Sequence, residues 1–393
     1  TSRYPTRFSR SLAGRARAGS AVAGPRRRHR RPSRALTGGF FPLKESLVHG
    51  SLDKKPALPP PSSRARADPE GLLPRAASTI YENRRKMVLI TKPDHLSKLS
   101  ETPHVIIRGQ KRYLSEYADR TEIKMGLLDL SNLGISNLRE IKGLDAIEEV
   151  RILFLQDNCL TSLEHLPRFP RLEQLDLSNN KIRSIKSLEN QTSHLLETLW
   201  LGNNQISCIE GLENVNLRYL DLSMNNISKI ANIDHMIDLE ELYLSRNEIT
   251  KIEGLETLVN LKRLHLSHNG IKKIEGLKGL KNLKSLHLSY NPIQKIENLE
   301  ANTRLEHLFM AYTNITRIEN LDHLTNLQTL RLEKGNITRI EGLSKLINLE
   351  ELFFHNLDET INHEMETCVN YNDYGDNRAY AQAVVKYCQE HHV

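Results

Sequence analysis

Cysteine is scarce in this sequence, with four residues in 393, and no two of them are close together. Cys159, Cys208, Cys368 and Cys388 form no C-x-x-C pair, so their spacing predicts neither a disulfide framework nor a zinc finger. Few and dispersed cysteines fit a reducing compartment. We therefore expect the protein to act in the cytoplasm, in the nucleus or in both.

Long apolar runs and the common catalytic motifs are also missing. No apolar stretch approaches the roughly 18 residues that a membrane-spanning helix needs. The sequence has no glycine-rich phosphate-binding loop, no G-x-S-x-G nucleophile motif and no H-E-x-x-H zinc motif. We expect a protein that is not an enzyme and that binds no cofactor and no metal.

Acidic residues are rare in the first part of the chain, which has none before Glu45. Residues 1–86 hold 20 of the 55 Lys and Arg but 5 of the 48 Asp and Glu, a balance of +15 that leaves −8 for the rest. We predict that 1–86 is a disordered basic and proline-rich tail. A nuclear-localisation patch, a nucleic-acid contact made by this tail alone, and a mitochondrial transit peptide over 1–44 stay open as alternatives. We also hypothesise that Met87 is the working start.

The middle of the chain repeats every 22 residues. Four consecutive units over 217–296 have the form L-x-x-L-x-L-x-x-N, followed two residues later by isoleucine. A fixed period of this length is typical of a solenoid rather than a globular domain. With the asparagine position as the marker, we predict eleven units. Their markers are Leu133, Asn158, Asn180, Asn204, Asn225, Asn247, Asn269, Asn291, Thr313, Gly335 and Leu357.

The repeat has a direct physical interpretation. The L-x-L alternation predicts a short strand with one buried face, and strands of successive units would pair in one parallel sheet. After the asparagine the chain turns back, and I-x-x-I returns apolar side chains to the same core. The asparagine amide would satisfy backbone groups of adjacent coils. No single coil can bury its own apolar face, so stability should come from stacking.

The period, the L-x-x-L-x-L-x-x-N pattern and a recurrent I-E-G/N-L link at 252–255, 274–277, 296–299 and 318–321 carry a resemblance to a known family. The chain resembles the short leucine-rich-repeat family typified by the leucine-rich-repeat regulatory subunit of type-1 protein phosphatase. The resemblance covers about 123–357. It implies an α/β solenoid with a parallel concave sheet and short helical or 3-10 convex segments. It also implies a scaffold that binds the phosphatase catalytic subunit on the concave face. Cytoskeletal and axonemal adaptors share the short repeat and are the alternative.

The residue between the two leucines of each L-x-L should point away from the core. These residues would form one column across the sheet, with neighbours about 4.8 Å apart. Acidic and aromatic residues alternate in the first six units, and aromatic side chains are enriched in protein-binding hot spots. The alternative is that the column merely holds residues suited to strands. We predict a partner-binding site made of Asp129, Phe154, Asp176, Trp200, Asp221, Tyr243, His265, His287, Phe309, Arg331 and Phe353.

Charge on the predicted concave face divides into two halves. Such a division would orient a partner of complementary charge as well as hold it. Histidines on adjacent units could in principle chelate zinc, but no Cys, Asp or Glu completes a set, so we interpret them as surface histidines. The acidic half has Asp129, Asp157 and Glu241, and the second half has Arg263, His268, His307, Arg331 and Lys334.

The ends of the repeat array need covers, because a terminal coil stacks on one side only. We predict an N-terminal cap over 87–122, the solenoid over 123–357 and a C-terminal cap over 358–393. Residues 377–391 should form an amphipathic helix, with Tyr380, Val384, Tyr387 and Cys388 on one face. A partner-binding role for this helix is an alternative.

Overall fold

The computed structural model describes residues 104–107, 110–113, 126–190, 193–337, 339–353 and 376–392. The predicted tail over 1–86 and most of the predicted cap over 87–122 lie outside the described residues, as does the predicted marker Leu357. The limits assigned to the four parts of the chain therefore stay predictions.

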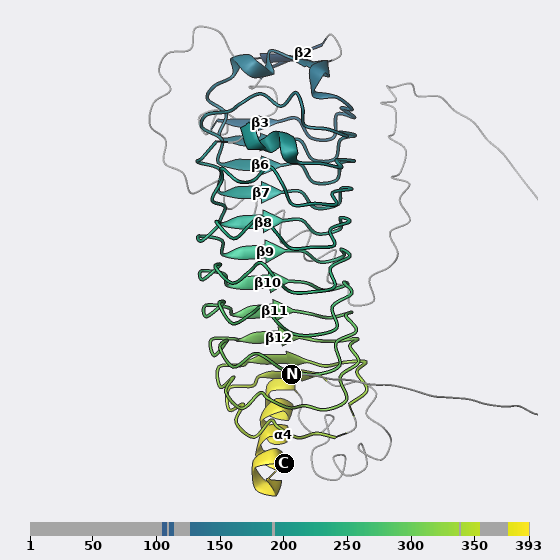
Figure 1. The fold of residues 1–393 in the computed structure, drawn as a ribbon, viewed down its shortest axis with the longest axis vertical. Helices are drawn as coiled ribbons and strands as arrows, with labels where there is room; N and C mark the ends of the chain where they lie inside the picture. The colour runs from purple at the N-terminus through teal and green to yellow at the C-terminus, as the bar shows by residue number, and fades with distance from the viewer. Residues whose placement is uncertain are drawn as a thin grey trace, which may run out of the picture. The chain divides into compact units, whose positions relative to one another are not determined.

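Eleven short strands form one parallel sheet in which the strands follow one another in chain order (Figure 1). The predicted solenoid is confirmed, and so is the position of every predicted strand. The strands are β3 (Leu127–Asp129), β5 (Ile152–Phe154), β6 (Gln174–Asp176), β7 (Thr198–Trp200), β8 (Tyr219–Asp221), β9 (Glu241–Tyr243), β10 (Arg263–His265), β11 (Ser285–His287), β12 (His307–Phe309), β13 (Thr329–Arg331) and β14 (Glu351–Phe353).

The middle residue of each of these strands is a leucine that points into an aliphatic core. Because side chains alternate along a strand, the first and third residues of each strand point to the opposite side. We call the surface formed by these first and third residues the outer face of the sheet. The core itself is closed by the leucines and isoleucines of the return segments, such as Ile227, Ile230 and Leu239, which are fully buried or nearly so.

The marker asparagines join neighbouring coils. Nδ2 of Asn225 donates to the carbonyl oxygens of Leu201 and Leu222, at 3.0 Å each, and its Oδ1 accepts from the backbone N–H of Ile206 at 2.9 Å. Every interior asparagine thus satisfies backbone groups of two coils, as predicted. The same arrangement recurs at Asn158, Asn180, Asn204, Asn247, Asn269 and Asn291.

The residue before each marker has a left-handed backbone conformation, which the sequence analysis did not anticipate. Non-glycine residues adopt a positive φ rarely, and bulky ones more rarely still. Ten successive coils nevertheless place one there, because the stacked coils on both sides fix the turn. These residues, with φ between 54° and 59°, are Asn132, Asp157, Asn179, Asn203, Met224, Arg246, His268, Tyr290, Tyr312 and Lys334.

Short elements accompany the return segments and the N-terminal end. Strands β1 (His104–Ile107) and β2 (Gln110–Tyr113) form an antiparallel hairpin, and β1 also pairs with β4 (Ile141–Lys142). The 3-10 helices within the described residues are η1 (Leu138–Glu140), η2 (Leu144–Ala146) and η3 (Lys186–Asn190).

Helix α4 (Asn377–His391) covers the last coil and has the bounds that the sequence predicts. It buries Val384 and Cys388 in the same core cluster as the leucines of the repeats. Its glutamines also satisfy backbone carbonyls at the end of the stack. Nε2 of Gln382 donates to the carbonyl oxygen of Leu349 at 2.6 Å, and Nε2 of Gln389 donates to that of Ser344 at 2.8 Å.

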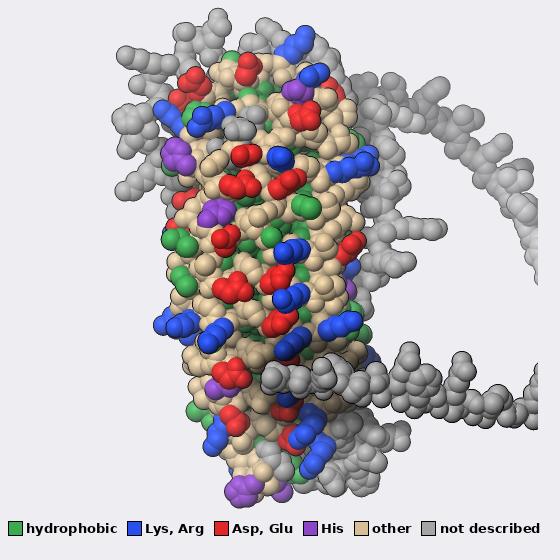
Figure 2. All heavy atoms as spheres, in the orientation of Figure 1, with side chains coloured by type: hydrophobic (Ala, Val, Ile, Leu, Met, Phe, Trp, Pro, Cys, Tyr) green, Lys and Arg blue, Asp and Glu red, His purple; other side chains and the backbone are tan. Residues whose placement is uncertain are grey.

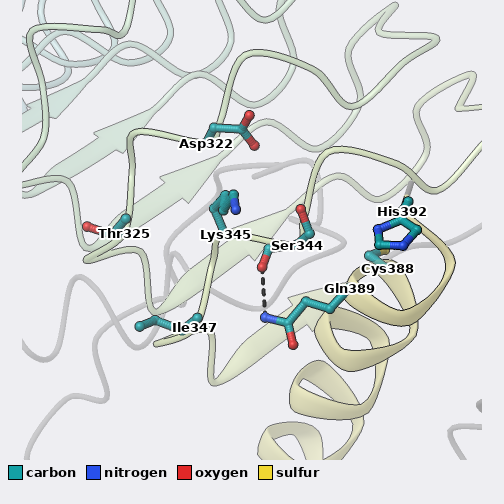
Figure 3. Close-up of a pocket in the computed structure, with 8 residues that line it drawn as sticks. All are labelled: Asp322, Thr325, Ser344, Lys345, Ile347, Cys388, Gln389 and His392. Atoms are coloured by element: carbon teal, nitrogen blue, oxygen red, sulfur yellow. Dashed lines mark hydrogen bonds between the residues drawn. The ribbon is translucent and has the colours of Figure 1, made fainter.

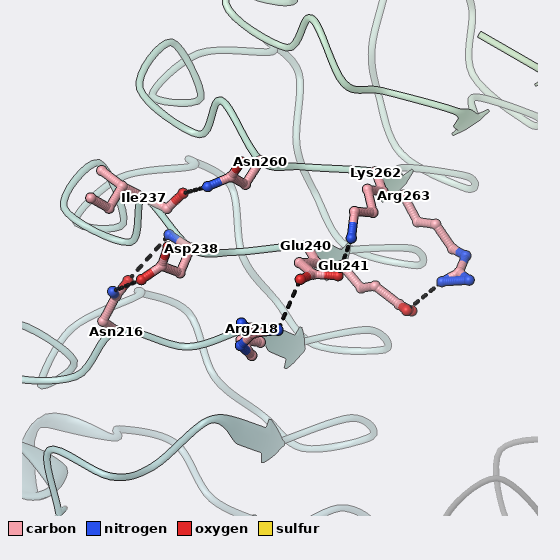
Figure 4. A network of polar contacts seen from close by, with 9 residues as sticks. All are labelled: Asn216, Arg218, Ile237, Asp238, Glu240, Glu241, Asn260, Lys262 and Arg263. Atoms are coloured by element: carbon pink, nitrogen blue, oxygen red, sulfur yellow. Dashed lines mark hydrogen bonds and ion pairs between the residues drawn. The ribbon is translucent and has the colours of Figure 1, made fainter. Parts of the chain in front are cut away.

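Polar side chains also form ladders beside the sheet (Figure 4). Glu240 is paired with Arg218 of the coil before it, at 3.0 Å, and with Lys262 of the coil after it, at 2.5 Å. Asn260 donates to the carbonyl oxygen of Ile237 at 3.0 Å, and later coils repeat this bond. On the face drawn in Figure 2, acidic and basic side chains are interspersed along the stack. Exposed pairs of this kind stabilise a protein by little, about 0–1 kcal/mol each.

Candidate docking face

The structure places all eleven predicted site residues in one column. Each is the third residue of its strand, and the strand register pairs each with the next. The column therefore begins at Asp129 on β3 and ends at Phe353 on β14. The repeat pattern predicted this alignment, and the alignment holds even where the marker spacing departs from 22 residues, as in the 25 residues between Leu133 and Asn158.

Rings in and beside this column contact one another along the sheet. The ring centroid of His265 lies 4.4 Å from that of Tyr243 and 3.8 Å from that of His287. The ring centroids of His287 and Phe309 are 4.1 Å apart. Tyr219, the first residue of β8, extends this series toward the N-terminal end, and the sequence analysis missed it. We call the series the aromatic ladder. Its members are Trp200, Tyr219, Tyr243, His265, His287 and Phe309.

A second, shorter stack of rings stands beside the aromatic ladder. The ring centroids of His268 and Tyr290 are 3.9 Å apart, and those of Tyr290 and Tyr312 are 4.2 Å apart. All three residues have the left-handed conformation described above. Tyr290 and Tyr312 were not predicted as site residues. Their position directly before the marker was the signal in the sequence that could have found them.

Two predicted site residues are not accessible, which corrects the expectation that the whole column faces solvent. Asp176 is 0% exposed and Trp200 is 2% exposed. Trp200 lies outside the aliphatic core cluster, but the ring of Tyr219 on the next strand packs against it at a centroid distance of 5.5 Å. Strands about 4.8 Å apart force large rings to lean on one another, so a ring on the outer face can still be covered. The other nine residues of the column are half-buried.

The aspartates of the column have a structural role that the sequence analysis did not assign. Oδ1 of Asp129 accepts a hydrogen bond from the backbone N–H of Ser131 at 2.9 Å. Asp221 accepts from Ser223 in the same way at 2.9 Å. Such bonds between a side chain and the backbone two residues on stabilise turns. The L-D-L-S sequence therefore has a local explanation, and the alternation of acids with rings is in part a feature of the turns.

The predicted division into an acidic and a basic half is weaker in the structure than in the sequence. Arg263 and Glu241, which were assigned to opposite halves, form an ion pair with each other. Burial, and then the positive charge of Arg263, lowers the pKa of His265 to about 3. Burial, with neighbouring His265 next, lowers the pKa of His287 well below its ordinary range. Both rings are therefore neutral at physiological pH, and they add no positive charge to the second half.

We searched the described residues for a metal site, a reactive nucleophile and a membrane-spanning helix. No group of three or more His, Cys, Asp or Glu side chains there could hold a metal ion. A surface cavity of about 550 Å³ lies beside α4 (Figure 3), and Ser344, Cys388 and His392 are among the residues that line it. Burial raises the pKa of the Cys388 thiol to about 11, so the thiol stays protonated at neutral pH and is not a nucleophile. None of the described helices combines the length and apolar character needed to cross a bilayer.

Comparison with known proteins supports the fold. A family model described as leucine-rich repeats in two copies matches residues 148–190, 170–214, 215–257 and 259–301. The structure of an internalin, InlF, from Listeria monocytogenes is similar, with a TM-score of 0.52 and 26% identity over 61% of this chain and 70% of that chain. A leucine-rich-repeat protein from Leptospira interrogans has a TM-score of 0.48 and 24% identity, over 61% and 70% of the two chains. No curated protein is significantly similar in sequence.

Proposed function

Because leucine-rich repeats build this solenoid, we propose that the chain is a non-enzymatic scaffold that docks a protein partner on the outer face of its sheet. The observation that carries the proposal is the distribution of rings. Among the described residues, Phe169 is the only aromatic side chain in the core cluster, which is otherwise aliphatic apart from Met and Cys. The aromatic ladder instead lies on the outer face, where it contributes nothing to closing the core.

Rings on a surface are suited to protein binding. Aromatic side chains are enriched in the central, energetically dominant part of protein interfaces, whereas charged residues are depleted there. The half-buried rings of Phe154, Tyr243 and Phe309 are held by strands, so little conformational entropy is lost when a partner covers them. A rigid sheet that presents rings in one line is a surface that a partner can dock on without rearrangement.

The partner that we favour is the catalytic subunit of type-1 protein phosphatase, and the activity would then be regulation of dephosphorylation. The support is the resemblance to the short-repeat regulatory subunit, together with the half-buried acidic and aromatic residues in the first half of the column, which are Asp129, Phe154, Asp221 and Tyr243. A cytoskeletal or axonemal adaptor is the alternative, for which the basic tail of the sequence is the supporting feature. Co-sedimentation with microtubules would favour that alternative.

A binding assay with purified phosphatase catalytic subunit tests the proposal. Phe154→Ala combined with Phe309→Ala removes two half-buried rings of the outer face without touching the covered Trp200. We expect at least about a thirtyfold loss of affinity, because truncation of a hot-spot side chain costs about 2 kcal/mol or more. Val259→Ala, at an exposed position away from the strands, is the control and should bind like the parent. Equal affinity of the double variant and the parent would refute docking of this partner on the outer face.

A further inference from the structure

Arg331 has a setting that no other cation of the described outer face shares. It is the third residue of β13, and its register partners are Phe309 on β12 and Phe353 on β14. The guanidinium carbon lies 4.3 Å from the centroid of the Phe353 ring and 5.7 Å from that of Phe309. Ring faces attract a guanidinium and can stack on it, so the two strands hold the charged group in place.

This arginine has no counter-ion among the described residues. The other arginine of the outer face, Arg263 on β10, is paired with Glu241, whereas no ion pair is formed by Arg331 in the part of the chain that the structure describes. Nε of Arg331 is buried and has no hydrogen-bond acceptor there. Because Nε is covered, an acceptor that arrives from solvent would bind the terminal NH2 groups of the guanidinium instead.

Two acidic side chains precede or follow Arg331 on the same coil or the next, and neither forms an ion pair with it among the described residues. Glu351, in register with Thr329, accepts a hydrogen bond from the Thr329 hydroxyl at 3.3 Å. Glu333, two residues after Arg331, is half-buried, and no ion pair joins it to Arg331 among the described residues. Lys334, in the turn after β13, is exposed and adds a second positive charge beside this end of the outer face. These groups leave the guanidinium available to an acceptor that arrives from outside.

We infer that Arg331 anchors a carboxylate of the docked protein partner, and that the partner segment crossing β12 to β14 is therefore acidic. This inference rests on the proposed function and names the chemistry of its partner. A guanidinium fits a carboxylate through two parallel N–H···O bonds, which fixes orientation as well as charge. The flanking phenylalanines would exclude water from those bonds and strengthen them.

An acidic protein segment fits this surface better than a nucleic acid does. Bases bind to protein surfaces by stacking on open ring faces. In the stacked part of the aromatic ladder, His265, His287 and Phe309 already use their faces on one another, at centroid distances of 3.8 and 4.1 Å. The sequence after residue 86 also carries a balance of −8, which repels a long polyanion such as a nucleic acid. A short segment with one or two carboxylates meets the local positive charges of Arg331 and Lys334 and needs no open ring face.

Selection of peptides tests the inference with the full chain. A library of random peptides displayed on phage is selected on the parent, on Arg331→Gln and on Arg331→Lys, with Arg339→Gln as the control. Arg339 is an exposed arginine of the same coil and lies outside the strand. Equal melting temperatures of the four proteins establish that each is folded. We expect Asp and Glu to be enriched among peptides selected by the parent and by Arg339→Gln, and not among those selected by Arg331→Gln.

The best peptide is then synthesised and its affinity measured by calorimetry. Arg331→Gln should weaken binding by about tenfold or more, as should Glu→Gln at the anchoring position of the peptide, and the two changes together should cost no more than either alone. Arg331→Lys keeps the charge but not the planar fork, so it should bind with intermediate affinity.

Three outcomes would overturn the inference. They differ in whether they also contradict docking on the outer face. Peptides without acidic enrichment that still require Phe154 and Phe309 would remove the role of Arg331 and leave outer-face docking in place. Failure to select any peptide, or selection that no outer-face variant alters, would contradict both. Binding of single-stranded oligothymidylate that is lost in Arg331→Gln, in the absence of acidic peptides, would assign the site to nucleic acid instead.

Discussion

Leu266→Ala should lower the free energy of unfolding by about 2–5 kcal/mol, the range measured for buried leucines in other proteins. Leu266 is 0% exposed and belongs to the core cluster shared by all coils of the solenoid. Its backbone N–H donates to the carbonyl oxygen of His287 on the next coil at 2.8 Å, and the strand before it, β10, pairs with β9 and β11, so the backbone around the side chain is fixed. The cavity left by alanine therefore cannot collapse easily. Urea denaturation followed by circular dichroism measures the effect.

The exposed Leu195 provides the matched control for this substitution. It is 45% exposed, so Leu195→Ala should change the free energy of unfolding by no more than about 0.5 kcal/mol. If Leu266→Ala unfolds at the same urea concentration as the parent, the register of the repeat is not the one described above. Repeat proteins can lose cooperativity, so the slope of each transition should be compared as well as its midpoint.

Asn225→Ala should cost about 3 kcal/mol or more, although asparagine is polar and alanine is a good core residue. The substitution leaves the carbonyl oxygens of Leu201 and Leu222 and the backbone N–H of Ile206 without the bonds that the amide makes. Each buried polar group that loses its partner costs about 1–3 kcal/mol. Asn225→Asp should be no better, because a carboxylate cannot donate to the two carbonyl oxygens.

The adjacent Asn226 gives the control for Asn225. Asn226 is exposed on the surface, whereas Asn225 is buried between two coils. Asn226→Ala should therefore leave stability nearly unchanged under the same denaturation protocol. Equal losses at the two positions would show that helix or turn propensity, and not the bonds between coils, determines the effect.

The period of the sequence was enough to predict the solenoid, the register and the column of site residues. Strand residues such as Phe154 and Phe309 fall where the period places them, because a parallel stack permits one register only. The asparagines were equally predictable, since their spacing requires each amide to meet the backbone of the neighbouring coil. The period therefore determines which residues lie side by side on neighbouring strands and the face of the sheet to which each side chain points.

Accessibility on the outer face was not predictable in the same way. Trp200 is covered because a tyrosine, Tyr219, occupies a different strand position on the next coil, and the repeat pattern leaves that position free to vary. The bonds of Asp129 and Asp221 to the following turns depend on side-chain rotamers, which the pattern does not specify. The left-handed position was missed because its residue type varies: three coils have the asparagine usual at such turns, but others have Met, Arg, His, Tyr or Lys there, as at Tyr290.

Whether the outer face is the docking surface is tested most directly by photo-crosslinking from single positions. The photoreactive residue p-benzoylphenylalanine is placed at Phe309, in the column, or at Val259, which is 48% exposed and lies outside the strands. Irradiation in a cell extract should attach a partner to the chain labelled at Phe309 and none to the chain labelled at Val259. A partner crosslinked from Val259 and absent from Phe309 would contradict docking on the outer face.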